Sequence, residues 1–97
     1  MRLNCVEEKL SHKRTNERSN VMERTEQLTI RAGRNEVESY KDDGYRFVQR
    51  YTEPNNSYAI VLQHPRTLRR LTIVVQPRWG MVLTKEGSRI LKIRTFN

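Results

Sequence analysis

The sequence has little cysteine, no long apolar run and few glycines. Cys5 is its one cysteine, so no disulfide can form within the chain, and two histidines beside it are too few for a structural zinc site. The longest apolar run, residues 59–62, is far shorter than the roughly 18 residues of a membrane span. The four glycines are too scattered for a phosphate-binding loop. We therefore expect no metal, no cofactor and no membrane span.

The beginning of the chain does not have the pattern of a targeting segment. Glu7 and Glu8 fall within the first ten residues, where a signal or transit peptide is apolar or basic. An intracellular location, cytoplasmic or nuclear, is the expectation. With 97 residues, of which 35% are hydrophobic, the chain can bury one small core.

Acidic residues are scarce in the second half of the chain. Residues 1–43 contain nine Lys or Arg and nine Asp or Glu, whereas residues 44–97 contain ten and two. The second half therefore carries the whole net charge of +8, and it also carries most of the apolar periodicity. This asymmetry predicts an N-terminal arm over residues 1–27 and a single small α+β domain over residues 28–97.

The arm has a short amphipathic pattern that soon stops. Leu3, Val6 and Leu10 recur at helical spacing, but residues 11–20 have no large apolar side chain, so they form either a solvated helix or a flexible linker. Residues 21–28 can continue a helix, whereas residues 28–32 alternate and favour a short strand.

A second helix is expected directly before the strands. Asn35 and Glu38 have the spacing of a capping pair, which predicts a short helix over residues 36–42. Gly44 is then the residue at which this helix ends.

From Tyr45 onward the sequence predicts an antiparallel sheet or small barrel of four to five strands, on which the short helix packs. In the first strand, alternation places Tyr45, Phe47 and Tyr51 on one face and Arg46 and Arg50 on the other. Short connections favour antiparallel neighbours. Residues 85–93 can alternatively form a short closing helix. The expected strands cover residues 45–51, 57–63, 70–76, 81–84 and 90–96.

Arginine outnumbers lysine fourteen to five, and the planar guanidinium binds phosphate in a bidentate manner and stacks on bases. A basic face is expected on the side of the sheet away from Phe47, Leu71 and Ile73, formed by Arg46, Arg50, Arg70, Lys92 and Arg94. Trp79 lies beside an arginine in a turn, where its ring can stack on a base. The candidate nucleic-acid-binding residues are Arg46, Arg50, Arg66, Arg69, Arg70, Arg78, Trp79, Arg89 and Arg94.

These features predict a small basic protein that binds RNA or single-stranded DNA without catalysis. The alternative is a protein-interaction module or inhibitor that docks on an acidic partner. The neutral arm with its apolar stripe favours that alternative, and it also allows self-association through the arm.

A second alternative is metal-independent RNA cleavage, with His64 as a base among Arg66, Arg69 and Arg70. Residues 44–50, 62–65 and 69–73 resemble the strand region of small HicA-type RNase toxins, whose fold is similar to that of double-stranded RNA-binding domains. Residues 85–91 resemble the closing helix of that family. At the position of the family's catalytic Gly-Ser-His this chain has Asn56, Ser57 and Tyr58.

Overall fold

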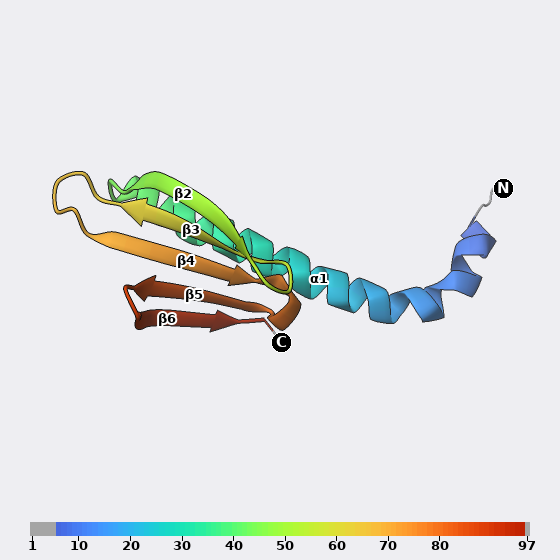
Figure 1. Cartoon of the computed structure of the whole chain (residues 1–97). Coiled ribbons are helices and arrows are strands. Elements are labelled where there is room, and N and C mark those ends of the chain that lie inside the picture. The colour runs from blue at the N-terminus through green and yellow to red at the C-terminus, as the bar shows by residue number, and fades with distance from the viewer. Residues whose placement is uncertain (1–5, 97) are drawn as a thin grey trace.

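The computed structural model describes the backbone of residues 6–96 and the side chains of residues 24–96. One long helix is followed by five strands and a single 3-10 turn (Figure 1). The elements are α1 (Val6–Asp42), β2 (Arg46–Glu53), β3 (Ser57–Gln63), β4 (Arg70–Gln76), η1 (Pro77–Trp79), β5 (Met81–Glu86) and β6 (Arg89–Thr95).

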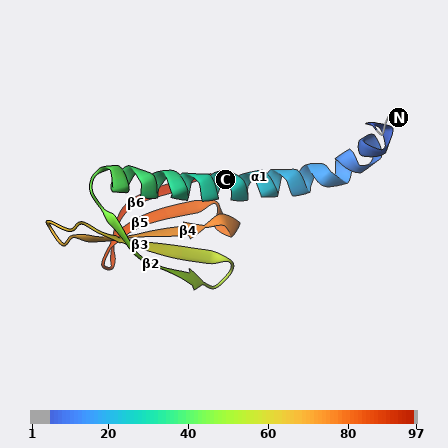
Figure 2. The same cartoon turned by 90° about the horizontal axis from the view of Figure 1, so that it is seen from above.

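The five strands form one antiparallel sheet in which spatial order follows chain order, β2-β3-β4-β5-β6. The C-terminal half of α1 lies along one face of this sheet, and its N-terminal half extends beyond the strands (Figures 1 and 2). The predicted α+β class, with a helix packed on a mainly antiparallel sheet, is confirmed. No helix in the described part of the chain is long and apolar enough to cross a bilayer.

The core lies between α1 and the middle of the sheet. Ala32 and Val37 of α1 pack against a buried cluster on β3, β4 and β5, and the tyrosines near the end of the helix close the cluster on one side. Alternation along each strand directs these side chains toward the helix, as the sequence predicts for Leu71, Ile73 and Val75. The sheet side chains of this cluster are Leu62, Ile73, Val75 and Val82.

A buried carboxylate also connects α1 to the far strands. Glu36 accepts hydrogen bonds from Thr84 Oγ1 at 3.3 Å and from Lys92 Nζ at 3.2 Å. The Glu36 side chain is buried, whereas Lys92 is half exposed at the edge of the sheet. The Lys92 side chain is directed toward the helix, and its ammonium group compensates the buried negative charge of Glu36.

Gly33 allows α1 to approach β4 closely. A Cβ atom at Gly33 would lie 2.5 Å from Val75 Cγ2, far inside van der Waals contact. We expect Gly33→Ala to lower the free energy of unfolding by about 1 kcal/mol, because overpacking costs about 1–3 kcal/mol and the better helix propensity of alanine returns only about 1 kcal/mol. Urea unfolding measures the change, and adding Val75→Ala should recover part of it. A Gly33→Ala variant more stable than the wild type would contradict this packing.

Two sequence predictions about α1 are wrong. The helix runs without a break through residues 28–32, which therefore form no strand, and it begins at Val6 rather than after Asn35. The residues that α1 buries between Thr29 and Val37 are mostly small or polar, so the sequence shows no large apolar stripe there. Of the predicted stripe in the arm, Leu3 lies outside the described residues.

The end of α1 is predicted correctly. Gly44 has a φ of 103°, which disfavours residues with a side chain, and its N–H donates to the carbonyl of Lys41 at 3.0 Å. The N–H of Tyr45 donates to the carbonyl of Tyr40 at 3.0 Å. These bonds satisfy carbonyls of the last turn and direct the chain into β2.

Residues 85–91 form the β5–β6 hairpin rather than a helix. Gly87, with a φ of 63°, occupies the turn between these strands. The closing helix that the HicA-type resemblance implies is therefore absent from these described residues, and a fourth and a fifth strand take its place.

Candidate nucleic-acid interface

The five cations that the sequence assigns to one face of the sheet lie on both faces. Arg46 and Arg70 both pair with Gln63 and point away from α1, as predicted. For Arg50, Lys92 and Arg94 the prediction is wrong, because they pair with Ile60, Thr84 and Val82 and share the face of α1.

A β-bulge explains the position of Arg50. The register of β2 against β3 shifts between Phe47 and Gln49, so one extra residue is inserted and the alternation reverses. Arg46 and Arg50, four residues apart, consequently point to opposite faces. Lys92 and Arg94 lie on β6, an edge strand, where long cationic side chains reach solvent beyond the helix.

Arg69 and Arg89 lie at one end of the sheet, where both contact Glu86. Arg69 binds this carboxylate through two hydrogen bonds, Nε to Oε2 at 3.1 Å and Nη2 to Oε1 at 3.2 Å. Arg89 Nη2 lies 3.6 Å from Oε1 of the same carboxylate. The hydrogen bond from Arg69 lowers the pKa of Glu86, so the carboxylate stays charged at neutral pH and partly neutralises both arginines.

Arg78, Trp79 and Arg94 lie at the opposite end of the strands. Arg78 and Trp79 belong to η1, which follows β4, and both side chains are exposed. The guanidinium of Arg94 lies 5.5 Å from the ring centre of Phe96. The nine predicted residues therefore do not form one continuous surface.

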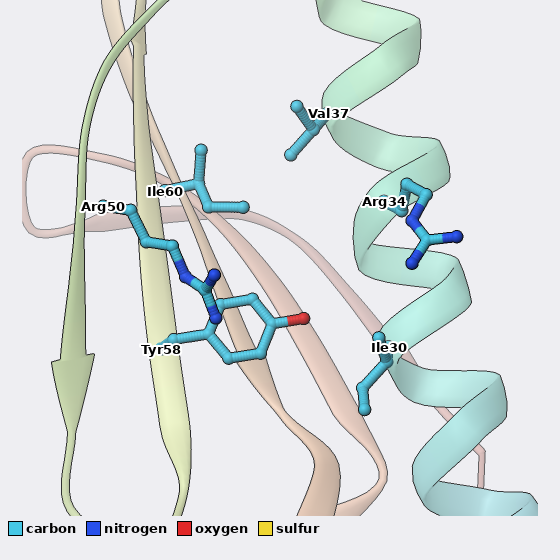
Figure 3. A pocket seen from close by; sticks show the side chains of 6 residues that line it. All are labelled: Ile30, Arg34, Val37, Arg50, Tyr58 and Ile60. Carbon is cyan, nitrogen blue, oxygen red and sulfur yellow. The ribbon is translucent and has the colours of Figure 1, made fainter.

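A different set of cations lines hollows between α1 and the β2 edge of the sheet. A hollow of about 380 Å³ lies between these two elements and β3, and Figure 3 shows the side chains that line it. The Arg50 guanidinium covers the Tyr58 ring at 4.3 Å, and the Tyr58 hydroxyl points toward α1 (Figure 3). The floor is apolar. The lining residues are Ile30, Arg34, Val37, Arg50, Tyr58 and Ile60.

Two more hollows are lined by cations of α1, β2 and the β3–β4 loop. The first, about 200 Å³, shares Ile30 and Arg34 with the hollow of Figure 3 and adds Arg31. The second, about 480 Å³, lies where α1 ends and β2 begins, and its lining includes Lys41, Arg46, His64 and Arg66. None of the described residues that line the three hollows is acidic. We name their six cations, Arg31, Arg34, Lys41, Arg46, Arg50 and Arg66, the α1–β2 basic tract.

An exposed aromatic ring lies on β2 next to this tract. Phe47 follows Arg46 on β2, pairs with Leu62 and therefore lies on the α1 face, yet 56% of it is exposed. The sequence places Phe47 and Tyr51 on one face. That is wrong, because the bulge directs Tyr51 to the side away from α1. Phe47 can therefore present its ring to a ligand.

His64 forms part of the β3–β4 loop. Its Nδ1 accepts hydrogen bonds from the backbone N–H groups of Arg66, at 3.1 Å, and Thr67, at 3.4 Å. Its ring packs edge-on against Tyr45, with 5.2 Å between centroids, and Nε2 would lie 2.9 Å from a Cβ atom at Gly44. These contacts hold the imidazole in the wall of the hollow of about 480 Å³, where it positions the backbone around Arg66.

Sequence reasoning missed Arg31, Arg34 and Lys41. Their spacing of three and seven residues places them on one side of a helix, a signal that is lost when residues 28–32 are interpreted as a strand. Lys41 also lies 4.0 Å from Glu38, an exposed contact at the limit of an ion pair.

Tyr58 gives the hollow of Figure 3 a pH-dependent stability. Burial raises the pKa of Tyr58 above 10.0, although the nearby charges of Arg50 and Arg34 oppose this shift. The stability that neutral Tyr58 contributes is therefore complete below about pH 10 and is lost as the pH rises through the folded pKa. We expect Tyr58→Phe to lose less stability than the wild type between about pH 9 and about pH 11 in urea unfolding. Equal losses in the two proteins would contradict this assignment.

Comparisons with known proteins find no matching family model, no matching curated protein and no matching solved structure. Among the described residues, no group of three or more His, Cys, Asp or Glu side chains could hold a metal ion. The function therefore has to be inferred from the chemistry of the α1–β2 basic tract.

Proposed function

We propose that the protein binds RNA or single-stranded DNA along the α1–β2 basic tract. The observation that carries this proposal is that two adjoining hollows beside α1 and a third at the junction of α1 and β2 are lined by six cations and by no acidic side chain among the described residues. Five of the six are arginines, whose planar guanidinium suits the phosphate group. A polyanion is the ligand that such a surface attracts most strongly.

The spacing of the cations suits an extended ligand rather than a single anion. Arg34 and Lys41 are seven residues apart on α1, which corresponds to about 10 Å along the helix axis. Arg50 faces the helix from the middle of β2, and Arg46 lies where the chain passes from α1 into β2. Successive phosphates of one strand can therefore contact successive cations.

The aromatic rings favour unpaired bases over a duplex. Phe47 is exposed on the same face as Arg50, and stacking on such a ring requires a base that is free of its partner strand. The Arg50 guanidinium, which lies on Tyr58, presents a second planar surface. These two features support a nucleic acid over an acidic protein as the ligand.

A salt titration tests the proposal directly. We expect the intact chain to bind a fluorescent oligouridylate, measured by anisotropy, with a slope of log K against log salt of about −4 when all six cations contact phosphates. Weak binding at low salt, or a slope near zero, would overturn the proposal.

A second polyanion separates nucleic acid from acidic protein surfaces. Polyglutamate of matched charge has no bases to stack, so it should bind more weakly than the oligouridylate at every salt concentration. Equal affinity for the two polymers would count against nucleic acid as the ligand.

A further inference from the structure

The face of the sheet opposite α1 has one apolar row that crosses all five strands. Tyr51, Ala59, Val74, Leu83 and Ile93 pair from strand to strand and form one row over all five strands. In the next row Val61 and Ile90 are apolar, whereas the residues between them, Thr72 and Lys85, are polar. No described element covers this face (Figure 2).

The outer members of the row are large and exposed. Tyr51 on β2 is 41% exposed and Ile93 on β6 is 55% exposed, whereas the central Ala59 and Val74 are buried beneath their neighbours. Large apolar side chains exposed at both ends of a row on an uncovered sheet face are typical of a surface that packs against a protein. The row therefore indicates a docking surface.

The charges at the two ends of this face are opposite. Glu53, at the end of β2, pairs with Ser57 and lies on the open face, whereas Arg46 lies on the same face at the start of β2. Arg70 and Lys85 add positive charge near Arg46. Within the described side chains, Glu53 and Arg46 form no ion pair.

This arrangement is complementary to a second copy of itself. When one copy is rotated by a two-fold axis that lies between the two sheets and crosses the strands, the acidic end of each β2 meets the basic end of the other. We propose that two copies of the chain pack through their open sheet faces, with the apolar rows in contact and Glu53 of each copy beside Arg46 of the other. Closed two-fold contacts of this type use one patch twice.

The proposed dimer leaves the two hollows beside α1 accessible, whereas Arg46 takes part in both the dimer contact and the nucleic-acid interface. Face-to-face sheets pack about 10 Å apart and bury the inner side chains. The hollows of Figure 3 and of Arg31 lie on the α1 side, which then forms the outside of both copies. Association is measured without nucleic acid, so it can fail while the proposed function holds, and the reverse is also true.

Mass measurement on the intact chain tests the dimer. We expect light scattering and sedimentation equilibrium to show twice the 11.6 kDa mass of one chain, with dissociation on dilution. Ile93→Lys should raise the dissociation constant at least tenfold. Phe47→Lys is the matched control, because Phe47 is equally exposed but lies on the α1 face, so this variant should associate like the wild type.

Charge reversal tests the orientation of the two copies. Glu53→Arg should weaken association at least tenfold, because it brings two cations together, and Arg46→Glu added in the same chain should restore it. Circular dichroism verifies that each variant is folded. A wild type that stays monomeric at high concentration, a dimer that survives Ile93→Lys, or a double variant that is not restored would each overturn the proposal.

Discussion

Replacing Arg34 and Arg50 together by glutamine is expected to lower the affinity for single-stranded nucleic acid about a hundredfold or more. The two guanidiniums lie on either side of the hollow of Figure 3, one on α1 and one on β2, so each can contact a different phosphate of the same strand. Hydrogen bonds to a charged group contribute about 1.5–3 kcal/mol each, and two of them account for this loss. The salt slope should also become shallower by roughly 1.4, since each lost phosphate contact removes about 0.7.

The matched control is the double variant Arg78→Gln with Arg94→Gln. It lowers the net charge of +8 by the same two units, but through residues that line none of the three hollows. We expect its affinity to fall several-fold at most, through the weaker overall field, with the slope nearly unchanged. If the two double variants lose affinity equally, binding follows net charge and not the α1–β2 basic tract.

The strands can be predicted from the sequence because alternation and turn residues agree. Leu71, Ile73 and Val75 recur at period two, and Pro77 cannot donate to a ladder, so β4 and its end are both specified. Asn55 and Asn56 adopt φ values of 64° and 61°, as a tight turn requires. In this half of the chain local preference and tertiary packing favour the same structure.

The helix is harder to predict because it buries polar residues and leaves apolar ones partly exposed. Thr29 and Glu36 are buried against the sheet, whereas Leu28 and Ile30 are partly exposed. Burial of Glu36 depends on Thr84 and Lys92, which are 48 and 56 residues away in the chain. These partners lie outside any local window of the sequence. Hydrophobic periodicity therefore does not predict that the helix continues through residues 28–36.

Two errors in the sequence prediction hide the candidate site. Reading residues 28–32 as a strand separates Arg31 and Arg34 from Lys41, and the bulge after Phe47 moves Arg50 to the α1 face. A bulge inserts one residue without a distinctive sequence signal, yet it reverses every later side chain of the strand. Composition therefore indicates an arginine-rich surface, but it does not indicate which arginines share it.

Replacing Phe47 by alanine separates stacking from charge. Phe47 is 56% exposed, so its loss should leave the core intact. Stacking of one base on an aromatic ring contributes about 1–3 kcal/mol, which corresponds to a loss of affinity between about fivefold and about a hundredfold. Because the ring neutralises no phosphate, we expect the salt slope of Phe47→Ala to equal that of the wild type, unlike the slope of the Arg34 and Arg50 double variant.

Two further variants complete this test by anisotropy with the same oligouridylate. Phe47→Trp should restore the affinity, because a larger ring stacks at least as well. Leu68→Ala, which removes a comparably exposed apolar side chain from the loop between β3 and β4, should have little effect. If Phe47→Ala binds as tightly as the wild type, no base stacks at this position and the ligand contacts the tract through its phosphates alone. The preference for unpaired bases would then lose its structural basis, and duplex and single strands should bind with similar affinity.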